Sequence, residues 1–139
     1  MTIAEYFRSV ASKRWRVGTM DCAVFMADWV REVTGRDPIA DVRGKYTTDK
    51  QMWKIVRSEG GFEASCAARL AALGMRITDM PKHGDILVVD APYKQRRGKN
   101  ICHPVGSIFA NGMHFVMTPD KGLVGARNDI LPMLKAWTF

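Results

Sequence analysis

The residues with the clearest chemical potential are Asp21 and Cys22, which directly precede a stretch of apolar residues with helical spacing. This position places the thiol in the first turn of a helix, where unpaired backbone N–H groups and the helix dipole favour negative charge. Such surroundings lower the pKa of a cysteine and make its thiolate a usable nucleophile. The alternative is structural, because an intracellular cysteine is more often a small, buried apolar side chain.

Helices are expected to fill the first half of the chain, because apolar residues recur there at helical spacing. The pattern predicts helices over residues 2–12, from 21 to about 34, over 48–57 and over 62–73. Asp21 and Thr48 are the predicted N-caps of the second and third helices, and Gly35 ends the second. Trp29 and Cys66 are expected to pack in the core.

After Gly74 the apolar pattern changes from helical to extended. The predicted strands are 86–89, 105–109, 114–117, 122–126 and 135–139, with Asn111-Gly112 as a hairpin turn. Helices followed by a contiguous run of strands favour an α+β fold, with N-terminal helices packed on an antiparallel β-sheet. The length of 139 residues fits a single domain over 1–139.

An ordered set of residues surrounds Cys22 and continues through the first half of the chain. The set is Trp15-x-x-Gly18-x-x-Asp21-Cys22, Ala27-Asp28-Trp29-Val30, Thr34-Gly35-x-Asp37-Pro38 and Arg43-Gly44-x-Tyr46. Further along, Gly84-Asp85 precedes an apolar strand, and a histidine lies ahead of Val105-Gly106. This order resembles the NlpC-type cell-wall cysteine peptidases, and most closely small members encoded among phage and gene-transfer-agent tail genes. The resemblance implies a reduced papain-like fold, in which the nucleophilic Cys begins a helix packed against an antiparallel sheet.

The resemblance also implies hydrolysis of amide bonds, with Cys22 as the nucleophile and a histidine of the sheet as the general base. In the family that histidine directly precedes Val-Gly, where this chain has Pro104, and His103 lies one residue earlier. Because successive strand residues face opposite sides, His103 points away from Cys22 unless Pro104 bends the chain or the strand starts after it. His103 is the first candidate base, and both orientations stay open.

Other residues that take part in this resemblance have further expected roles. The family's third polar residue, which orients the imidazole, corresponds to Val116 here, and His114 lies two residues earlier on the same strand face. His114 either substitutes for that residue or is an ordinary strand histidine. The Asp21 carboxylate opposes thiolate formation if it points toward the sulfur. Asp28 and Arg43 are expected to form an ion pair that supports the helix of Cys22.

The formal net charge of +7 predicts attraction to polyanions, such as a cell-wall polymer or nucleic acid. The densest basic run holds Lys94, Arg96, Arg97 and Lys99, but no nucleic-acid-binding motif accompanies it, so nucleic acid is the less favoured partner. The sequence shows no signal-peptide pattern, structural zinc spacing or transmembrane stretch. No metal or organic cofactor is implied.

Three hypotheses follow for the function. The first is a tail-associated cysteine peptidase, made in a host cytoplasm and located in the virion tail, with peptidoglycan peptides as substrate and tail tip, hub or baseplate proteins as partners. The second is a non-catalytic structural tail component that keeps the papain-like fold, motivated by the displaced His103 and by Val116. The third and least favoured is a basic nucleic-acid-binding module.

Overall fold

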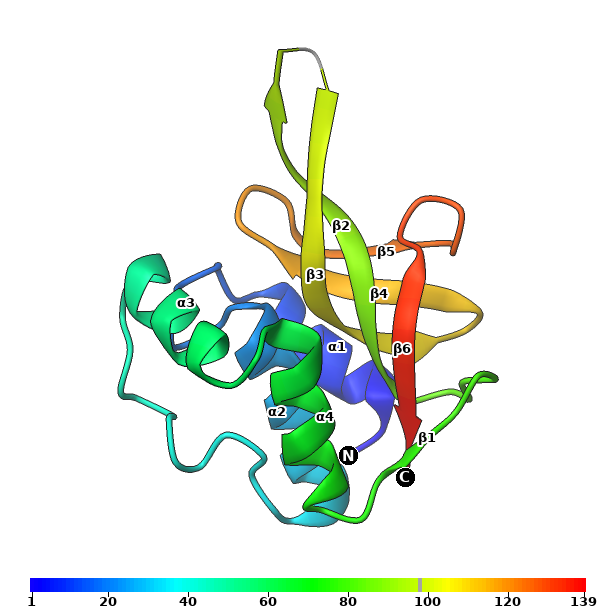
Figure 1. Ribbon diagram of the computed structural model, residues 1–139. Coiled ribbons are helices and arrows are strands. Elements are labelled where there is room, and N and C mark those ends of the chain that lie inside the picture. The colour runs from blue at the N-terminus through cyan, green and yellow to red at the C-terminus, as the bar shows by residue number, and fades with distance from the viewer. Residues whose placement is uncertain (98) are drawn as a thin grey trace.

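The computed structural model of the protein describes residues 1–97 and 99–139, and their side chains except those of 93–96 and 99–101. Within these residues the chain forms four helices, followed by six strands in one sheet (Figure 1). The helices are α1 (Ile3–Ala11), α2 (Cys22–Thr34), α3 (Asp49–Ser58) and α4 (Phe62–Ala71). The strands are β1 (Arg76–Ile77), β2 (Ile86–Arg96), β3 (Lys99–Ala110), β4 (Met113–Thr118), β5 (Gly122–Ala126) and β6 (Met133–Thr138). The predicted α+β class with N-terminal helices is confirmed.

The helix ends follow from side chains that satisfy free backbone groups. The Asp21 side chain accepts a hydrogen bond from the Val24 N–H, and the Thr48 side chain caps α3 in the same way, so both predicted N-caps are confirmed. Gly35 ends α2 with φ 73°, a left-handed conformation in which glycine carries no steric cost. The sequence therefore fixes where α2, the helix of Cys22, begins and ends.

The sheet is antiparallel throughout, with the strand order β1-β6-β2-β3-β4-β5. β2 and β3 are longer than predicted, because their ladder with each other continues beyond their neighbours. Pairing of β2 with β6 ends at Val89, and pairing of β3 with β4 begins only at Ile108. The outer part of the β2–β3 hairpin consequently extends away from the sheet (Figure 1). The two-residue strand β1 was not predicted.

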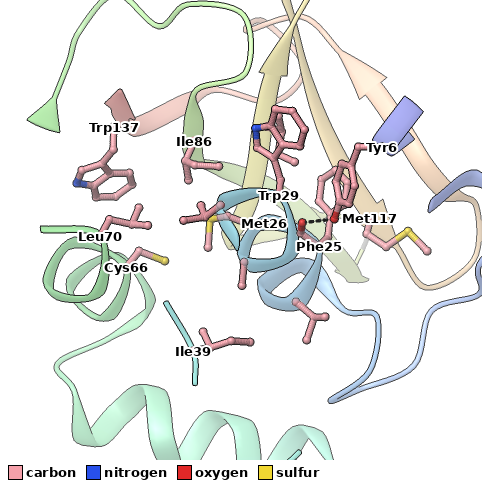
Figure 2. Close-up of a cluster of buried hydrophobic side chains, with 14 of the residues drawn as sticks. Tyr6, Phe25, Met26, Trp29, Ile39, Cys66, Leu70, Ile86, Met117 and Trp137 are labelled. Atoms are coloured by element: carbon pink, nitrogen blue, oxygen red, sulfur yellow. Dashed lines mark hydrogen bonds between the residues drawn. The ribbon is translucent and has the colours of Figure 1, made fainter. Parts of the chain in front are cut away.

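The main core lies between the helices and one face of the sheet. Figure 2 shows Phe25 and Trp29 of α2 at its centre, with Trp137 of β6 at one side. The Tyr6 hydroxyl donates to the Phe25 carbonyl oxygen at 2.6 Å, and the Trp29 Nε1–H donates to the Gly84 carbonyl oxygen at 2.8 Å. Trp29 is thus confirmed as a core residue, and Cys66 of α4 packs in the same cluster.

A second, smaller cluster of apolar side chains covers the opposite face of the sheet. It contains Leu87, Val89, Val116, Leu131 and Ala136. Leu87 and Val89 alternate along β2 with Ile86 and Val88 of the main core, as expected for a strand with two covered faces. The two clusters therefore give a reference for the direction in which each strand residue points.

Candidate functional site

The Asp21 carboxylate is fully buried and accepts three hydrogen bonds. Oδ1 accepts from the Val24 N–H at 2.8 Å. Oδ2 accepts from the Gly18 N–H at 2.9 Å and from the Tyr46 hydroxyl at 2.8 Å. Burial and the nearby carboxylate raise the pKa of Tyr46, so its phenol stays protonated as a donor. Asp21 is therefore the point where the loop before α2 and the loop before α3 are joined.

Gly18 cannot carry a side chain in this arrangement. Its φ is 86°, and a Cβ built on its backbone would overlap the Tyr46 carbonyl oxygen. Close approach of the two loops therefore needs glycine at this position. This contact and the Asp21 hydrogen bonds give a structural reason for the spacing of Gly18, Asp21 and Tyr46 in the sequence.

Arg43 connects the same loop to α2. Its guanidinium lies 2.8 Å from an Asp28 carboxylate oxygen and 2.6 Å from an Asp37 carboxylate oxygen. The predicted pair of Asp28 and Arg43 is thus confirmed, and Asp37 is an additional partner. Hydrogen bonds from Arg43 hold the pKa of Asp37 below its usual range. The segment that delivers Tyr46 to Asp21 is therefore fixed to α2 through Asp28 and braced internally through Asp37.

Cys22 lies in the first turn of α2 as predicted, but its thiol is not acidic in this structure. The residue is 9% exposed. Burial raises the pKa of Cys22 to about 12, and the Asp21 carboxylate adds to this effect. Backbone amides of Gly106, Cys22 and Ala23 favour the thiolate, but they do not offset the loss of water. The expectation of a lowered pKa is therefore wrong for this conformation, since desolvation exceeds the effect of the helix end.

A cavity of about 360 Å³ brings Cys22 and His103 together. We call it the Cys22 cavity. Its other lining residues include Trp15 before α2, Asp49 and Trp53 of α3, and Met117 of β4. Its volume falls in the range of small-molecule and peptide sites. The helix start that holds the thiol and the strand that holds the imidazole thus contribute to one concave surface.

His103 lies within a continuous strand whose pairing with its partner strand has an irregularity. β3 runs through Pro104 without interruption, so a strand that starts after Pro104 is wrong. His103 pairs with Ala91, and the ladder shifts its register between Pro92 and Lys94. Such an irregularity bends and twists a hairpin. His103 lines the Cys22 cavity although it lies one residue from the position that the family likeness indicates.

The His103 ring is held against α3. Its centroid lies 5.6 Å from that of the Trp53 ring, and the two planes are perpendicular. Burial lowers the pKa of His103, whereas the Asp90 and Asp49 carboxylates act in the opposite direction. The neutral imidazole, which is the form that accepts a proton, is therefore favoured at neutral pH.

β3 and α2 approach closely beside Cys22. A Cβ on Gly106 would lie 2.8 Å from the Cys22 carbonyl oxygen and 3.3 Å from the Met26 sulfur. A side chain at this position would push the strand away from the helix start. Gly106 therefore allows the sheet and the first turn of α2 to meet at Cys22.

His114 lies away from this site. It is 4% exposed, and its Nδ1 lies 2.7 Å from the Leu131 carbonyl oxygen. Its ring contacts Phe109, with 5.8 Å between centroids, beside the second apolar cluster. Val116, the position of the third family residue, is 4% exposed. His114 thus has the surroundings of a buried strand histidine.

A small apolar cavity of about 60 Å³ lies between α3, α4 and α2. Cys66 lines it, and Met52 and Val56 of α3 line both this cavity and the Cys22 cavity. None of residues 49–58, all of which the structure describes, is fully buried. α3 therefore covers the site without filling the space beneath it.

Several residues of the site are absent from the candidates that the sequence indicates. They are Asp49 and Trp53, which line the cavity, and Asp90, whose charge acts on His103. The apolar spacing of α3 predicts a packed face with Trp53 on it, and a carboxylate four residues before Trp53 shares that face. The Lys94, Arg96 and Lys99 side chains of the basic run lie outside the described residues.

The fold and the cavity define an α+β protein with a buried cysteine at a helix start and a histidine from the sheet beside it. The chain belongs to the family described as Domain of unknown function (DUF6950), whose profile matches residues 1–139. Searches of curated proteins and of solved structures found no match. Over the part of the chain that the structure describes, no helix is long and apolar enough to cross a membrane. Within the same residues no group of three or more His, Cys, Asp or Glu side chains gathers as metal ligands do.

Proposed function

We propose that the chain is a phage tail-associated cysteine peptidase with a reduced papain-like fold, and that it hydrolyses amide bonds of peptidoglycan stem peptides. The observation that carries the proposal is the cavity shared by Cys22 and His103. A thiol at a helix start and an imidazole on an antiparallel sheet are the two groups that such a reaction needs. The net charge of +7 supports an anionic cell-wall polymer as the target.

In the proposed reaction, the Cys22 sulfur attacks the carbonyl carbon of the amide while His103 takes the thiol proton. His103 then gives this proton to the leaving amine, and a thioester to Cys22 remains. Water, deprotonated by His103, hydrolyses the thioester and restores the thiol. Proton transfer during the attack suits a buried thiol, because it avoids a free thiolate. Backbone N–H groups in the first turn of α2 supply donors for the oxyanion.

A substrate reaches Cys22 only if the cover over the cavity moves. Trp53 and Met52 of α3 line the cavity, and Cys22 is 9% exposed beneath them. α3 has no fully buried residue within 49–58. Its apolar contacts are therefore few enough for local opening at a moderate cost in free energy. Opening would also hydrate the thiol and bring its pKa down.

A second candidate function is a structural tail component that retains the papain-like fold without catalysis. The burial of Cys22, which raises the pKa of its thiol to about 12, favours this alternative. Val116, at the position of the orienting residue, favours it as well. In this case, Cys22 is a core residue and the cavity has no substrate.

A Cys22→Ala variant distinguishes the two candidates in a muropeptide-release assay on purified cell walls. Peptidase activity should fall by at least about a thousandfold, because the nucleophile has no substitute. Cys66→Ala and Cys102→Ser serve as matched controls, one buried and one exposed, and should retain activity. Equal release by the parent and Cys22→Ala would remove the catalytic role. A parent without any release would favour the structural component.

A further inference from the structure

Two carboxylates approach His103 from directions that the family likeness does not indicate. Asp49 begins α3 and lines the Cys22 cavity together with His103. Asp90 lies on β2 directly before Ala91, the residue that pairs with His103, so its side chain starts from the opposite face of the ladder and only its charge acts on the imidazole. The position from which the likeness expects an orienting group is instead occupied by the apolar Val116.

The geometry of α3 connects one of these carboxylates to the imidazole. Asp49 and Trp53 are four residues apart, so they lie on the same face of the helix. The Trp53 ring meets the His103 ring at right angles with 5.6 Å between centroids. The helix that holds the imidazole in place therefore also brings a carboxylate to the same side of the cavity.

We propose that Asp49 on α3 is the positioning residue of His103 and holds its ring toward Cys22, and that Asp49, together with the charge of Asp90 on β2, stabilises the imidazolium formed during the reaction. This inference rests on the proposed function. The two residues act through His103 and need no contact with the substrate. The orienting role then comes from α3, the helix that covers the site, and not from β4.

The charged and titratable groups around His103 are consistent with this role. Among the side chains that the structure describes, they are the carboxylates of Asp49 on α3 and Asp90 on β2, the thiol of Cys22 on α2 and the carboxylate of Asp120 after β4, which lines the same cavity. Burial lowers the pKa of His103, and Asp90 and then Asp49 raise it. A carboxylate near an imidazole favours the protonated form, which is the form that exists after proton transfer from Cys22.

The test measures His103 directly, by NMR titration of its ring C–H signals in Asp49→Asn, Asp90→Asn and the double variant. The chain has three histidines, so a His103→Asn sample assigns the signal. His103 should titrate at lower pH in each variant and at the lowest pH in the double variant. The same variants should each lower kcat by about threefold, because this is the change in rate expected when one charge interaction with a partly exposed group is lost. KM should change little. The acid limb of the pH profile should shift to lower pH.

Conservative and distant variants complete the test. Asp49→Glu and Asp90→Glu keep the charge and should restore both the titration and most of the rate. Asp79→Asn removes an exposed carboxylate in the loop after β1 and should change neither. An unchanged His103 titration in the double variant overturns the proposal, whatever the activity. A Cys22-dependent activity that the double variant leaves unaltered overturns the positioning role as well. An inert parent refutes the proposed function, and the titration still decides whether the carboxylates act on His103, so the two failures are distinguishable.

Discussion

The two sides of the Cys22 cavity are built in different ways. On the side of the proposed nucleophile Cys22, which we call the nucleophile side, buried Asp21 joins Gly18, Val24 and Tyr46 through three hydrogen bonds, and Gly106 brings the sheet into contact with Cys22. On the base side, a half-buried His103 lies between α3 and the outer part of a two-stranded hairpin. The thiol is therefore held in a fixed place, whereas the position of the imidazole is set by α3 and the outer hairpin, which have few buried contacts.

This difference agrees with the chemistry that is proposed for each side. A nucleophile at a helix start needs accurate placement, because small displacements of reacting atoms are costly in rate. The base and its cover have to admit a substrate, and segments that move are drawn from the less stable parts of a fold. The experiments below change one side at a time and measure whether the other side responds.

The largest expected effect comes from Asp21→Ala on the nucleophile side. The variant should lose about 3 kcal/mol of unfolding free energy, because buried donors such as the Tyr46 hydroxyl lose their acceptor. Urea unfolding gives the measurement. Thr48→Ala is the matched control, since it removes the N-cap of α3, which lies at the surface, and should cost about 1 kcal/mol. Equal losses in the two variants would contradict the difference between the two sides.

A smaller effect is expected when the cover is weakened by Trp53→Ala. Loss of this half-buried ring should favour opening of α3 by about 1.4 kcal/mol, and so raise the rate of Cys22 alkylation by iodoacetamide about tenfold. Mass spectrometry follows the reaction, with exposed Cys102 replaced by serine. Because burial raises the pKa of Cys22 to about 12, its alkylation rate in the parent should keep increasing with pH up to that value.

Lys54→Ala is the control for that measurement, because Lys54 lies on the exposed side of the same helix. It should leave the alkylation rate of Cys22 unchanged. If Trp53→Ala and Lys54→Ala react at the rate of the parent, α3 is not the cover of the thiol, and access must come from another direction.

The smallest effect concerns the Arg43 contacts that support α2. Asp37→Asn should cost about 0.5–1 kcal/mol of unfolding free energy at neutral pH, as for a partly exposed ion pair. Arg43 lowers the pKa of Asp37 in the folded chain, so this contribution is fully present above about pH 4. It is lost as the pH falls through the lower, folded-state pKa, and the unfolding free energies of parent and variant should then converge.

The matched control is Asp129→Asn, since that carboxylate is 65% exposed and lies 3.8 Å from Arg127. It should change the unfolding free energy little at any pH. A difference between parent and Asp37→Asn that does not decrease as the pH is lowered would show that the ion pair is not its source.

Much of the fold follows from the sequence, because helical spacing and caps such as Asp21 and Thr48 are local signals. The nucleophile side could also be anticipated through its residue types, although the contact between Asp21 and Tyr46 could not. These residues lie 25 positions apart, and only the folded chain brings them together. The length of β2 and β3 was hidden as well, since Asp90 and Pro104 interrupt the apolar pattern of a ladder set by pairing between strands.

The environment of Cys22 shows where local signals fail. The helix start alone predicts an acidic thiol, but the balance is decided by burial beneath α3 and by the direction of the Asp21 carboxylate. Likewise, alternation along β3 places His103 on the face opposite to Gly106, yet His103 and Cys22 line one cavity, which residues of α3 complete. Both effects depend on residues distant in sequence, which no local pattern contains.

The small apolar cavity beneath α3 has a mechanical consequence. Its volume of about 60 Å³ is empty space that the chain no longer encloses once water enters. States with less internal void occupy less volume and are favoured by hydrostatic pressure. Compression should therefore separate α3 from α2, α4 and the loop of Ile39, Val42 and Tyr46, which all line this cavity. Under pressure, α3, the helix that covers the Cys22 thiol, should be the first element to separate from the rest of the protein.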